Sequence, residues 1–197
     1  MGYSIYIETL GCAKNRVDSE IMLGTLLKSG FGYEQDSELA EVIIVNTCGF
    51  LTSAVNESIN RILSLAEHKK TGRCLKLVVA GCMSERYRDS LLEEISEIDG
   101  IIGTSDYTEI LTCINNLLEN NERSNLLHHR PIYSKNNEQA IRALSTKQHY
   151  TYLKIAEGCS NMCSFCNIPK LRGKYVSREI DSISKEFLDL IDRGIKE

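Results

Sequence analysis

Short apolar runs alternate with longer amphipathic segments along the first 118 residues. The apolar runs predict strands over residues 3–8, 42–45, 75–80 and 100–103. Helices are predicted to begin at Asp18, at about Thr52, after a cap at Ser84 and near Tyr107, and the last three have one apolar face. Strands that alternate with helices indicate an α/β fold, here a doubly wound parallel sheet with helices on both faces.

A cysteine follows each of the first three predicted strands. These are Cys12, Cys48 and Cys82. The carboxyl ends of parallel strands share one edge of the sheet, where such folds bind ligands, so we expect the three thiols to lie together. A single free cysteine is more often a small buried apolar residue, but the repeated context favours a three-thiolate iron–sulfur site. Cys74 and Cys113 lack this context and are expected to be packing residues.

A second set of three cysteines follows an apolar strand pattern over residues 150–156. Cys159, Cys163 and Cys166 have a C-x3-C-x2-C spacing. A tight loop with three thiolates can hold an iron–sulfur cluster and leave one iron without a protein ligand. Zinc is the alternative, but a structural zinc site takes four protein ligands, and His149 lies ten residues upstream of Cys159.

The alternation of strands and helices is lost over residues 119–146, which are polar, contain Pro131 and are predicted to be a linker. His128 and His129 are interpreted there as solvated residues rather than ligands. Residues 147–197 are then predicted to begin a second domain, ending in a helix from about Asp181 with inward residues Ile183, Phe187, Leu190 and Ile191. A (β/α) barrel that would house the C-x3-C-x2-C loop needs roughly 200 residues or more. We therefore expect the barrel of this second domain to be incomplete and the chain to be inactive by itself.

Composition narrows the compartment and the partners. The formal net charge of −4 does not favour coating of nucleic acid by bulk charge. No apolar run approaches the roughly 18 residues of a membrane span, and no signal peptide is evident, so we expect a cytoplasmic protein without a membrane partner. In that setting the eight cysteines indicate metal or redox chemistry rather than disulfides.

Four stretches resemble motifs of the radical S-adenosylmethionine (SAM) methylthiotransferases. They are LGCAKNRVDSE at 10–20, NTCGF at 46–50, AGC at 80–82, and EGCSNMCSFC at 157–166 with Arg172 and Gly173 downstream. The resemblance spans the chain: residues 1–118 are similar to the N-terminal cluster-binding domain of the family, and 147–197 to the truncated start of its radical-SAM (β/α) barrel.

Two pairs of residues, one after each of the first two cysteines, favour one branch of that family. Ala13 and Lys14 after the first cysteine, and Gly49 and Phe50 after the second, resemble the RimO-type branch, which methylthiolates an aspartate of a small-subunit ribosomal protein. The closest competing branch modifies an adenosine beside the tRNA anticodon and usually carries Gln-Met and Val-Arg at those places. Nucleic acid is therefore a partner only under the alternative of a tRNA methylthiotransferase.

The resemblance implies two 4Fe-4S clusters and SAM as cofactors. Cys159, Cys163 and Cys166 would hold the cluster whose open iron chelates SAM, giving a 5'-deoxyadenosyl radical that abstracts hydrogen from an unactivated carbon. Phe165 would lie near the adenine, or else be an ordinary aromatic residue of the barrel core. The other cluster, on Cys12, Cys48 and Cys82, would present a methylated sulfur to the substrate radical, with the electron donor and the sulfur donor unidentified.

Roles for the residues beside the cysteines stay open at this point. One group could give hydrogen bonds to cluster sulfurs or contact a partner: Lys14, Asn15, Asp18, Ser19 and Asn46. The alternative is helix capping by Asp18 or Ser19 and a solvated Lys14. Lys170, Arg172 and Lys174 are either a basic patch facing the site or a solvated loop. A hypothesis of another class is a non-catalytic α/β module that binds a protein partner, with zinc or nothing on its cysteines.

Overall fold

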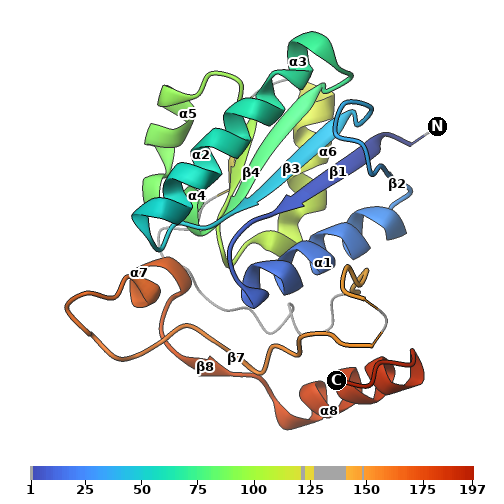
Figure 1. The fold of residues 1–197 in the computed structure, drawn as a ribbon, viewed down its shortest axis with the longest axis vertical. Coiled ribbons are helices and arrows are strands. Elements are labelled where there is room, and N and C mark those ends of the chain that lie inside the picture. Colours follow the sequence, from blue (N-terminus) through green and yellow to red (C-terminus); the bar gives the residue numbers. More distant parts are fainter. Residues whose placement is uncertain (1, 121–122, 127–140, 148) are drawn as a thin grey trace.

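A parallel sheet forms the centre of the protein. The computed structural model describes residues 2–120, 123–126, 141–147 and 149–197. Six strands lie in the order β2-β1-β3-β4-β5-β6, and every neighbouring pair is parallel (Figure 1). Their bounds are β1 Ser4–Thr9, β2 Gly32–Tyr33, β3 Val42–Thr47, β4 Lys76–Gly81, β5 Gly100–Ile102 and β6 Ser124–Leu126.

Helices cover both faces of this sheet. On one face α1 (Ala13–Lys28), η1 (Tyr107–Glu109) and α6 (Ile110–Asn120) pack against Ile44 and Val78. On the other face α2 (Thr52–Ala66), α4 (Cys82–Tyr87) and α5 (Asp89–Glu94) pack against Ile43 and Leu77. The short α3 (His68–Thr71) follows α2. The predicted parallel sheet with helices on both faces is confirmed.

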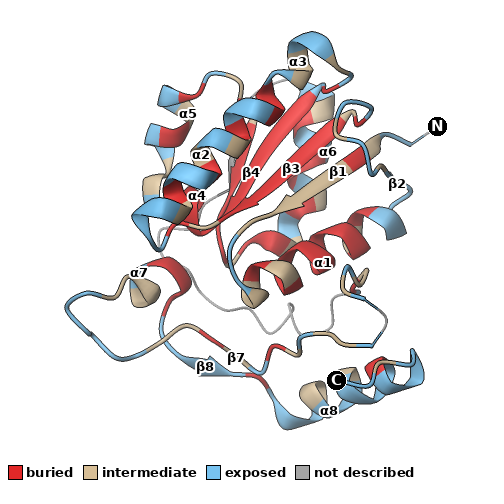
Figure 2. Ribbon diagram, in the orientation of Figure 1, coloured by how far each residue is buried: buried red, intermediate tan, exposed pale blue. Residues whose placement is uncertain are grey.

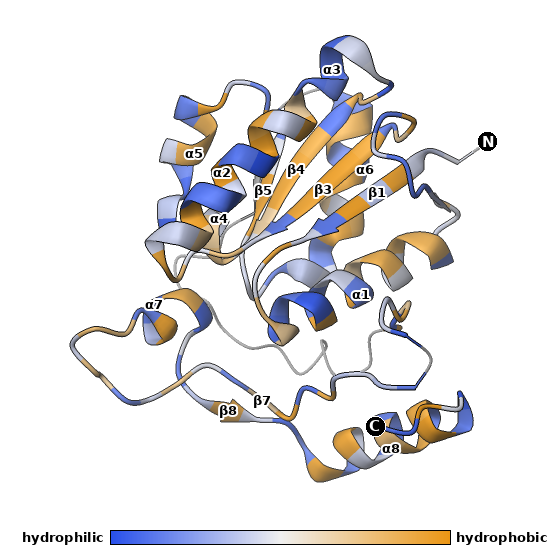
Figure 3. Ribbon diagram, in the orientation of Figure 1, coloured by the Kyte–Doolittle hydropathy of each residue, from blue (hydrophilic) through white to orange (hydrophobic). Residues whose placement is uncertain are grey.

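Burial on both faces explains the composition of the central strands. Every residue of β3 and of β4 is buried, and Figure 2 shows both strands in red between the helix layers. Strands covered on two sides are close to continuously apolar, as the orange colour of β3 and β4 shows in Figure 3. Cys74 and Cys113 lie in these two cores, as expected for packing residues.

Two predicted helix starts are wrong. Helix α1 begins at Ala13, directly after an extended Cys12, so Asp18 and Ser19 are buried inside the helix and cap nothing. Ser84 is likewise inside α4, where its hydroxyl donates to the Val79 carbonyl oxygen. In both cases the helix starts at or directly after the cysteine that follows the strand, which leaves no room for a separate capping turn. The predicted helix after Ser84 is also broken at Arg88, which has a φ of 50°.

Residues 141–147 and 149–197 lie against α1 and beside the carboxyl ends of the strands (Figure 1). They contain β7 (Ala156–Glu157) and β8 (Val176–Ser177), which are antiparallel, and the helices α7 (Ile168–Arg172) and α8 (Ile180–Asp192). The strand predicted over 150–156 is wrong except at its last residue, because a strand needs a paired neighbour and only Ala156 and Glu157 have one.

Helix α8 begins one residue before its predicted start, but its expected apolar face is largely uncovered. Leu190 is buried, whereas Phe187 and Ile191 are 52% and 48% exposed. The inward orientation predicted for these two residues is therefore wrong within the part of the chain that the structure describes.

The stretch predicted as a linker is described only in part. His128, His129 and Pro131 lie outside the described residues. Within the same stretch, β6 extends the sheet, and Arg142 is buried against Glu20. None of the described helices is long and apolar enough to cross a bilayer.

Candidate functional site

The first three thiols meet at one edge of the sheet. Cys12 follows β1, Cys48 comes directly after β3, and Cys82 is the first residue of α4 after β4. The strand order reverses between β1 and β3, and the crevice at such a reversal is where open α/β sheets bind their ligands. The sequence-based prediction that these cysteines share one sheet edge is thus confirmed.

Two glycines let the cysteine loops approach one another. A Cβ atom on Gly11, whose φ is +91°, would stand 2.8 Å from the Cβ and 3.4 Å from the Sγ of Cys48. A Cβ atom on Gly49 would stand 2.6 Å from the carbonyl oxygen of Cys82. The loop of Cys48 therefore touches both of the other loops, and a larger residue at either glycine would separate them.

The three thiols differ in exposure. Cys12 is exposed, Cys48 is half-buried and Cys82 is buried. Burial raises the pKa of the Cys82 thiol above its ordinary value; the guanidinium of Arg172 lowers it in opposition, and Cys48 adds a smaller rise. The Cys82 thiol and the Arg172 guanidinium both donate to Asn15 Oδ1, at 4.0 Å and 2.6 Å, so these two groups are near neighbours.

The donor chemistry of this edge fits a group held by thiolates. The loops of three cysteines lie at this edge, and the side-chain oxygen of Asn46, two residues before Cys48, is buried without a hydrogen-bond partner. The three thiols do not point at a common centre: among the described residues, no three His, Cys, Asp or Glu side chains are arranged to hold a metal ion. The edge thus supplies soft sulfur ligands of the kind that iron–sulfur clusters take.

The second cysteine set lies on an exposed loop between β7 and α7. Cys163 is exposed, and Cys159 and Cys166 are half-buried. Two backbone hydrogen bonds order the loop, from Cys159 N to Gly173 O and from Cys166 N to Cys163 O, both at 3.0 Å. Phe165 is 84% exposed, so its alternative interpretation as a core aromatic is wrong in the described structure.

Buried charges join the second segment to the first. We call Asp18, Lys154, Glu157 and Arg172 the ionic junction; their side chains are at most 5% exposed. Lys154 Nζ lies 2.5 Å from Asp18 Oδ1 and 3.1 Å from Glu157 Oε2. Arg172 donates to Asp18 Oδ2 at 3.0 Å and to Glu157 Oε2 at 2.9 Å. Each charge faces an opposite charge, as buried ions require.

The junction keeps its groups charged. Burial by itself would raise the pKa of Glu157, but Arg172 and Lys154 hold it well below its usual range. Burial would likewise lower the pKa of Lys154, yet Asp18, with Tyr107 and Glu157, raises it above its ordinary value. Both residues are therefore ionised at neutral pH, with Lys154 also donating to the Tyr107 hydroxyl at 3.2 Å.

The junction decides between the alternatives left open for the basic residues. Arg172 is buried in it, whereas Lys170 and Lys174 are exposed. Lys14 donates to the Ala156 carbonyl oxygen at 2.6 Å, so the interpretation of a merely solvated Lys14 is wrong. The partners Lys154 and Glu157 were missed from the sequence, because no periodicity links them to residues more than a hundred positions away.

A separate buried arginine ties the two segments farther along α1. Arg142 is paired with Glu20 of α1 at 2.6 Å and with Glu186 of α8. The other carboxylate oxygen of Glu20 accepts from Ser145 N at 2.9 Å. This contact touches neither cysteine set.

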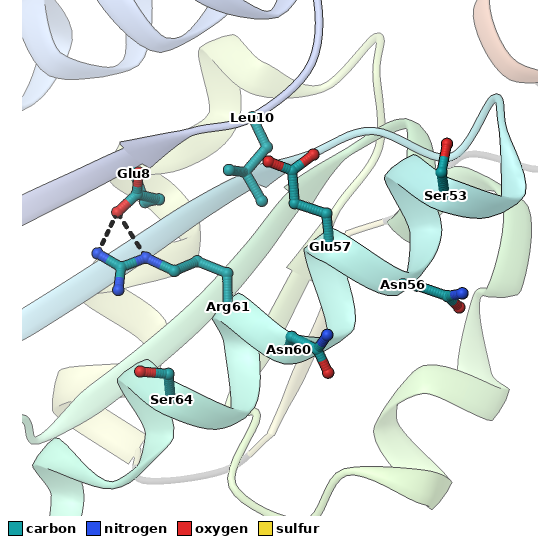
Figure 4. Close-up of a pocket in the computed structure, with 8 residues that line it drawn as sticks. All are labelled: Glu8, Leu10, Ser53, Asn56, Glu57, Asn60, Arg61 and Ser64. Carbon is teal, nitrogen blue, oxygen red and sulfur yellow. Dashed lines mark hydrogen bonds and ion pairs between the residues drawn. The ribbon is translucent and has the colours of Figure 1, made fainter.

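An open groove between the end of β1 and α2 is polar and contains no cysteine. Figure 4 shows its lining residues, Glu8, Leu10, Ser53, Asn56, Glu57, Asn60, Arg61 and Ser64. Its most prominent contact is the ion pair of Glu8 with Arg61, at 2.6 Å. The groove therefore offers none of the soft ligands that converge at the sheet edge.

Known proteins share the sequence around these features. Residues 4–103 match the family model described as "Uncharacterized protein family UPF0004". A relative from Desulforamulus reducens, named "Ribosomal protein uS12 methylthiotransferase RimO", is 46% identical over 98% of this chain and 43% of its own length.

Two further relatives carry the same name. The protein from Clostridioides difficile is 48% identical over 98% of this chain and 43% of its own length, and that from Acetivibrio thermocellus is 45% identical over 100% and 44%. The chain spans less than half the length of these relatives. The resemblance to RimO-type proteins is thus confirmed over the chain. Because the family model matches half of the chain, including β1 to β5 and the edge with Cys12, Cys48 and Cys82, the chain belongs to the UPF0004 family.

Proposed function

We propose that this chain is part of a radical SAM methylthiotransferase that adds a methylthio group to the β-carbon of an aspartate in a small-subunit ribosomal protein. The observation that supports it best is the pairing of two three-cysteine sets, one at a sheet edge and one on a loop, beside a shared ionic junction. The similarity to the relatives extends across both cysteine sets, and the names of these relatives support the same substrate class.

Each cysteine set has a separate task in this proposal. Cys12, Cys48 and Cys82 would hold one 4Fe-4S cluster at the sheet edge, and Cys159, Cys163 and Cys166 would hold the other together with SAM. When bound, these cofactors supply the radical and sulfur chemistry that the side chains of the protein lack. Phe165 is exposed beside Cys166 and is available to stack on a bound adenine. Such an enzyme would act in the cytoplasm, with residues 1–118 and 147–197 as parts of two domains.

Iron binding tests the two sites. The 197-residue chain is reconstituted with iron and sulfide without oxygen, beside variants in which Cys12, Cys48 and Cys82, or Cys159, Cys163 and Cys166, are replaced by alanine. We expect each triple variant to lose about half of the bound iron and of the visible absorbance, because each set holds one cluster. Cys74→Ala with Cys113→Ala is the matched control and should keep all of it. Zinc without iron uptake would instead support a non-catalytic metal-binding module.

Substrate choice is tested in a complete enzyme. These 197 residues replace the matching stretch of the Clostridioides difficile relative, and the chimera is incubated with SAM, a reductant, the ribosomal protein and tRNA. We expect mass spectrometry to find the methylthio group on an aspartate of the ribosomal protein. Modification of tRNA alone would refute the proposed substrate and support the tRNA methylthiotransferase.

A further inference from the structure

One fully buried side chain contacts all three loops of the sheet-edge site. Asn15, in the first turn of α1, is 1% exposed. Its amide nitrogen donates to Leu10 O and to Thr47 O, both at 2.9 Å, which fastens the loops of Cys12 and Cys48. Its amide oxygen accepts from Cys82 Sγ at 4.0 Å. Asn15 therefore contacts each of the loops that carry the first cysteine set.

Arg172 connects this asparagine to the second cysteine set. Its Nη2 donates to Asn15 Oδ1 at 2.6 Å, and its Nη1 donates to Glu157 Oε2 at 2.9 Å. Glu157 lies two residues before Cys159, and its other oxygen accepts from Gly158 N at 3.2 Å. A continuous series of contacts thus runs from the loops of Cys12 and Cys48, at Leu10 O and Thr47 O, through Asn15, Arg172 and Glu157 to the base of the Cys159–Cys166 loop.

We propose that Arg172 is a positioning residue that couples the two cysteine sets, holding one through Asn15 and the other through Glu157. This inference rests on the proposed function, since it concerns the clusters that the two sets would hold. It assigns to Arg172 a task beyond joining two segments: its single positive charge acts on both metal sites.

The chemistry of the guanidinium suits this task. Its rigid fork can donate to Asn15 and Glu157 from different nitrogens at the same time, which the single ammonium of lysine cannot reproduce. Its charge is 3% exposed and is therefore weakly screened. Reduction of an iron–sulfur cluster adds negative charge, so a buried cation nearby favours the reduced form and raises the reduction potential.

Arg142 provides a matched control. It is also a buried arginine that joins α1 to the second segment through two carboxylates, Glu20 and Glu186. The side chain of Arg142 donates to Glu186, Glu20 and Thr151, and not to Asn15 or Glu157, among the described residues. If Arg172 only fastens the segments together, replacement of Arg142 should have the same consequences as replacement of Arg172.

The first measurement is the reduction potential of each cluster, by redox titration followed by electron paramagnetic resonance. The 197-residue chain is reconstituted as wild type, Arg172→Met, Arg172→Lys and Arg142→Met. We expect Arg172→Met to lower both potentials, Arg172→Lys to restore most of that loss, and Arg142→Met to shift neither. Equal shifts in Arg172→Met and Arg142→Met, or none in Arg172→Met, would overturn the inference while leaving the proposed function intact.

The second measurement keeps the test decisive if Arg172→Met does not fold. Iron loss to a chelator is timed in Arg172→Lys and Arg142→Lys, each set being followed in a chain whose other set is alanine. Loss of a hydrogen bond that orients metal ligands commonly weakens metal binding 10- to 100-fold, so we expect about a 10-fold faster loss from both sets in Arg172→Lys only. Faster loss from one set alone would overturn the coupling. Absence of clusters in the wild type would instead refute the proposed function.

Discussion

The two cysteine sets are held in opposite ways. Cys12, Cys48 and Cys82 follow strands of a sheet whose central members are completely buried, so the backbone of each loop starts from a fixed point. Cys159, Cys163 and Cys166 lie on a loop whose tip, including Phe165, is exposed. Order in the second set comes from its base, where Glu157 and Arg172 are buried.

The two cysteine sets are therefore preorganised by different interactions. At the sheet edge, strand pairing and packing place the backbone of the cysteine loops before any ligand binds. On the loop, a few buried charges anchor the ends and leave the middle open, which suits a site that must admit a small molecule such as SAM. Three substitutions and one labelling experiment test whether the buried junction and the packed sheet contribute unequally to the stability of the protein.

The largest expected effect comes from Asp18→Asn in the ionic junction. Loss of this carboxylate leaves Lys154 and Arg172 sharing Glu157, and an uncompensated buried charge commonly costs about 3–5 kcal/mol. Urea unfolding followed by circular dichroism measures the loss. The control is Glu8→Gln in the more exposed pair with Arg61, which should cost about 1 kcal/mol or less. Equal losses in both variants would contradict a special role for the buried junction.

A second prediction compares the rate of alkylation of a core thiol, Cys74, with that of a loop thiol, Cys163. Burial raises the pKa of Cys74 from 9.0 to about 11, so below pH 9 it holds about 100-fold less thiolate than an ordinary cysteine, and its share rises only as the pH approaches 11. Iodoacetamide at pH 8, followed by mass spectrometry, should label exposed Cys163 well before Cys74 in the metal-free protein. In urea the two rates should converge. Native labelling of Cys74 at the rate of Cys163 would show that the core is open.

Gly49→Ala tests the close approach of the cysteine loops. The added methyl group would meet the backbone of Cys82 and Met83 at less than 3.0 Å, and overpacking of this kind costs about 1–3 kcal/mol. Gly32→Ala is the matched control, because a Cβ atom there meets nothing within 4 Å. The difference between the two in urea unfolding isolates the steric term. Unchanged stability in Gly49→Ala would mean that the loops can move apart freely.

The smallest expected effect is that of Thr104→Val. The Thr104 hydroxyl, after β5, donates to the Leu171 carbonyl oxygen in α7. Its removal should cost about 1 kcal/mol and speed hydrogen exchange in α7. Thr25→Val loses only a bond within α1 and should leave that exchange unchanged. If α7 exchanges at the same rate in both variants, Thr104 contributes nothing to holding the second segment.

Local patterns in the sequence were sufficient for four of the six strands of the sheet, whereas the short β2 and β6, of two and three residues, were not predicted. Continuous apolar runs predicted the buried strands, and the cysteine after each of three strands predicted the shared edge, because parallel strands with crossover helices bring their carboxyl ends together. The helix starts at Asp18 and Ser84 were mispredicted, since good capping residues were present but the chain turned into a helix immediately after each cysteine.

Tertiary structure alone decided how the two cysteine sets are related. Asn15 and Arg172 are separated by 157 positions, and Asp18 and Lys154 by 136. From sequence alone, a charged residue is expected at the surface, because burial of an ion is costly unless partners of opposite charge lie beside it. The sequence therefore determined the central strands of the sheet and the edge at which Cys12, Cys48 and Cys82 lie. Local periodicity does not reveal long-range pairing of buried charges, and this pairing decided where the second cysteine set lies relative to the sheet edge.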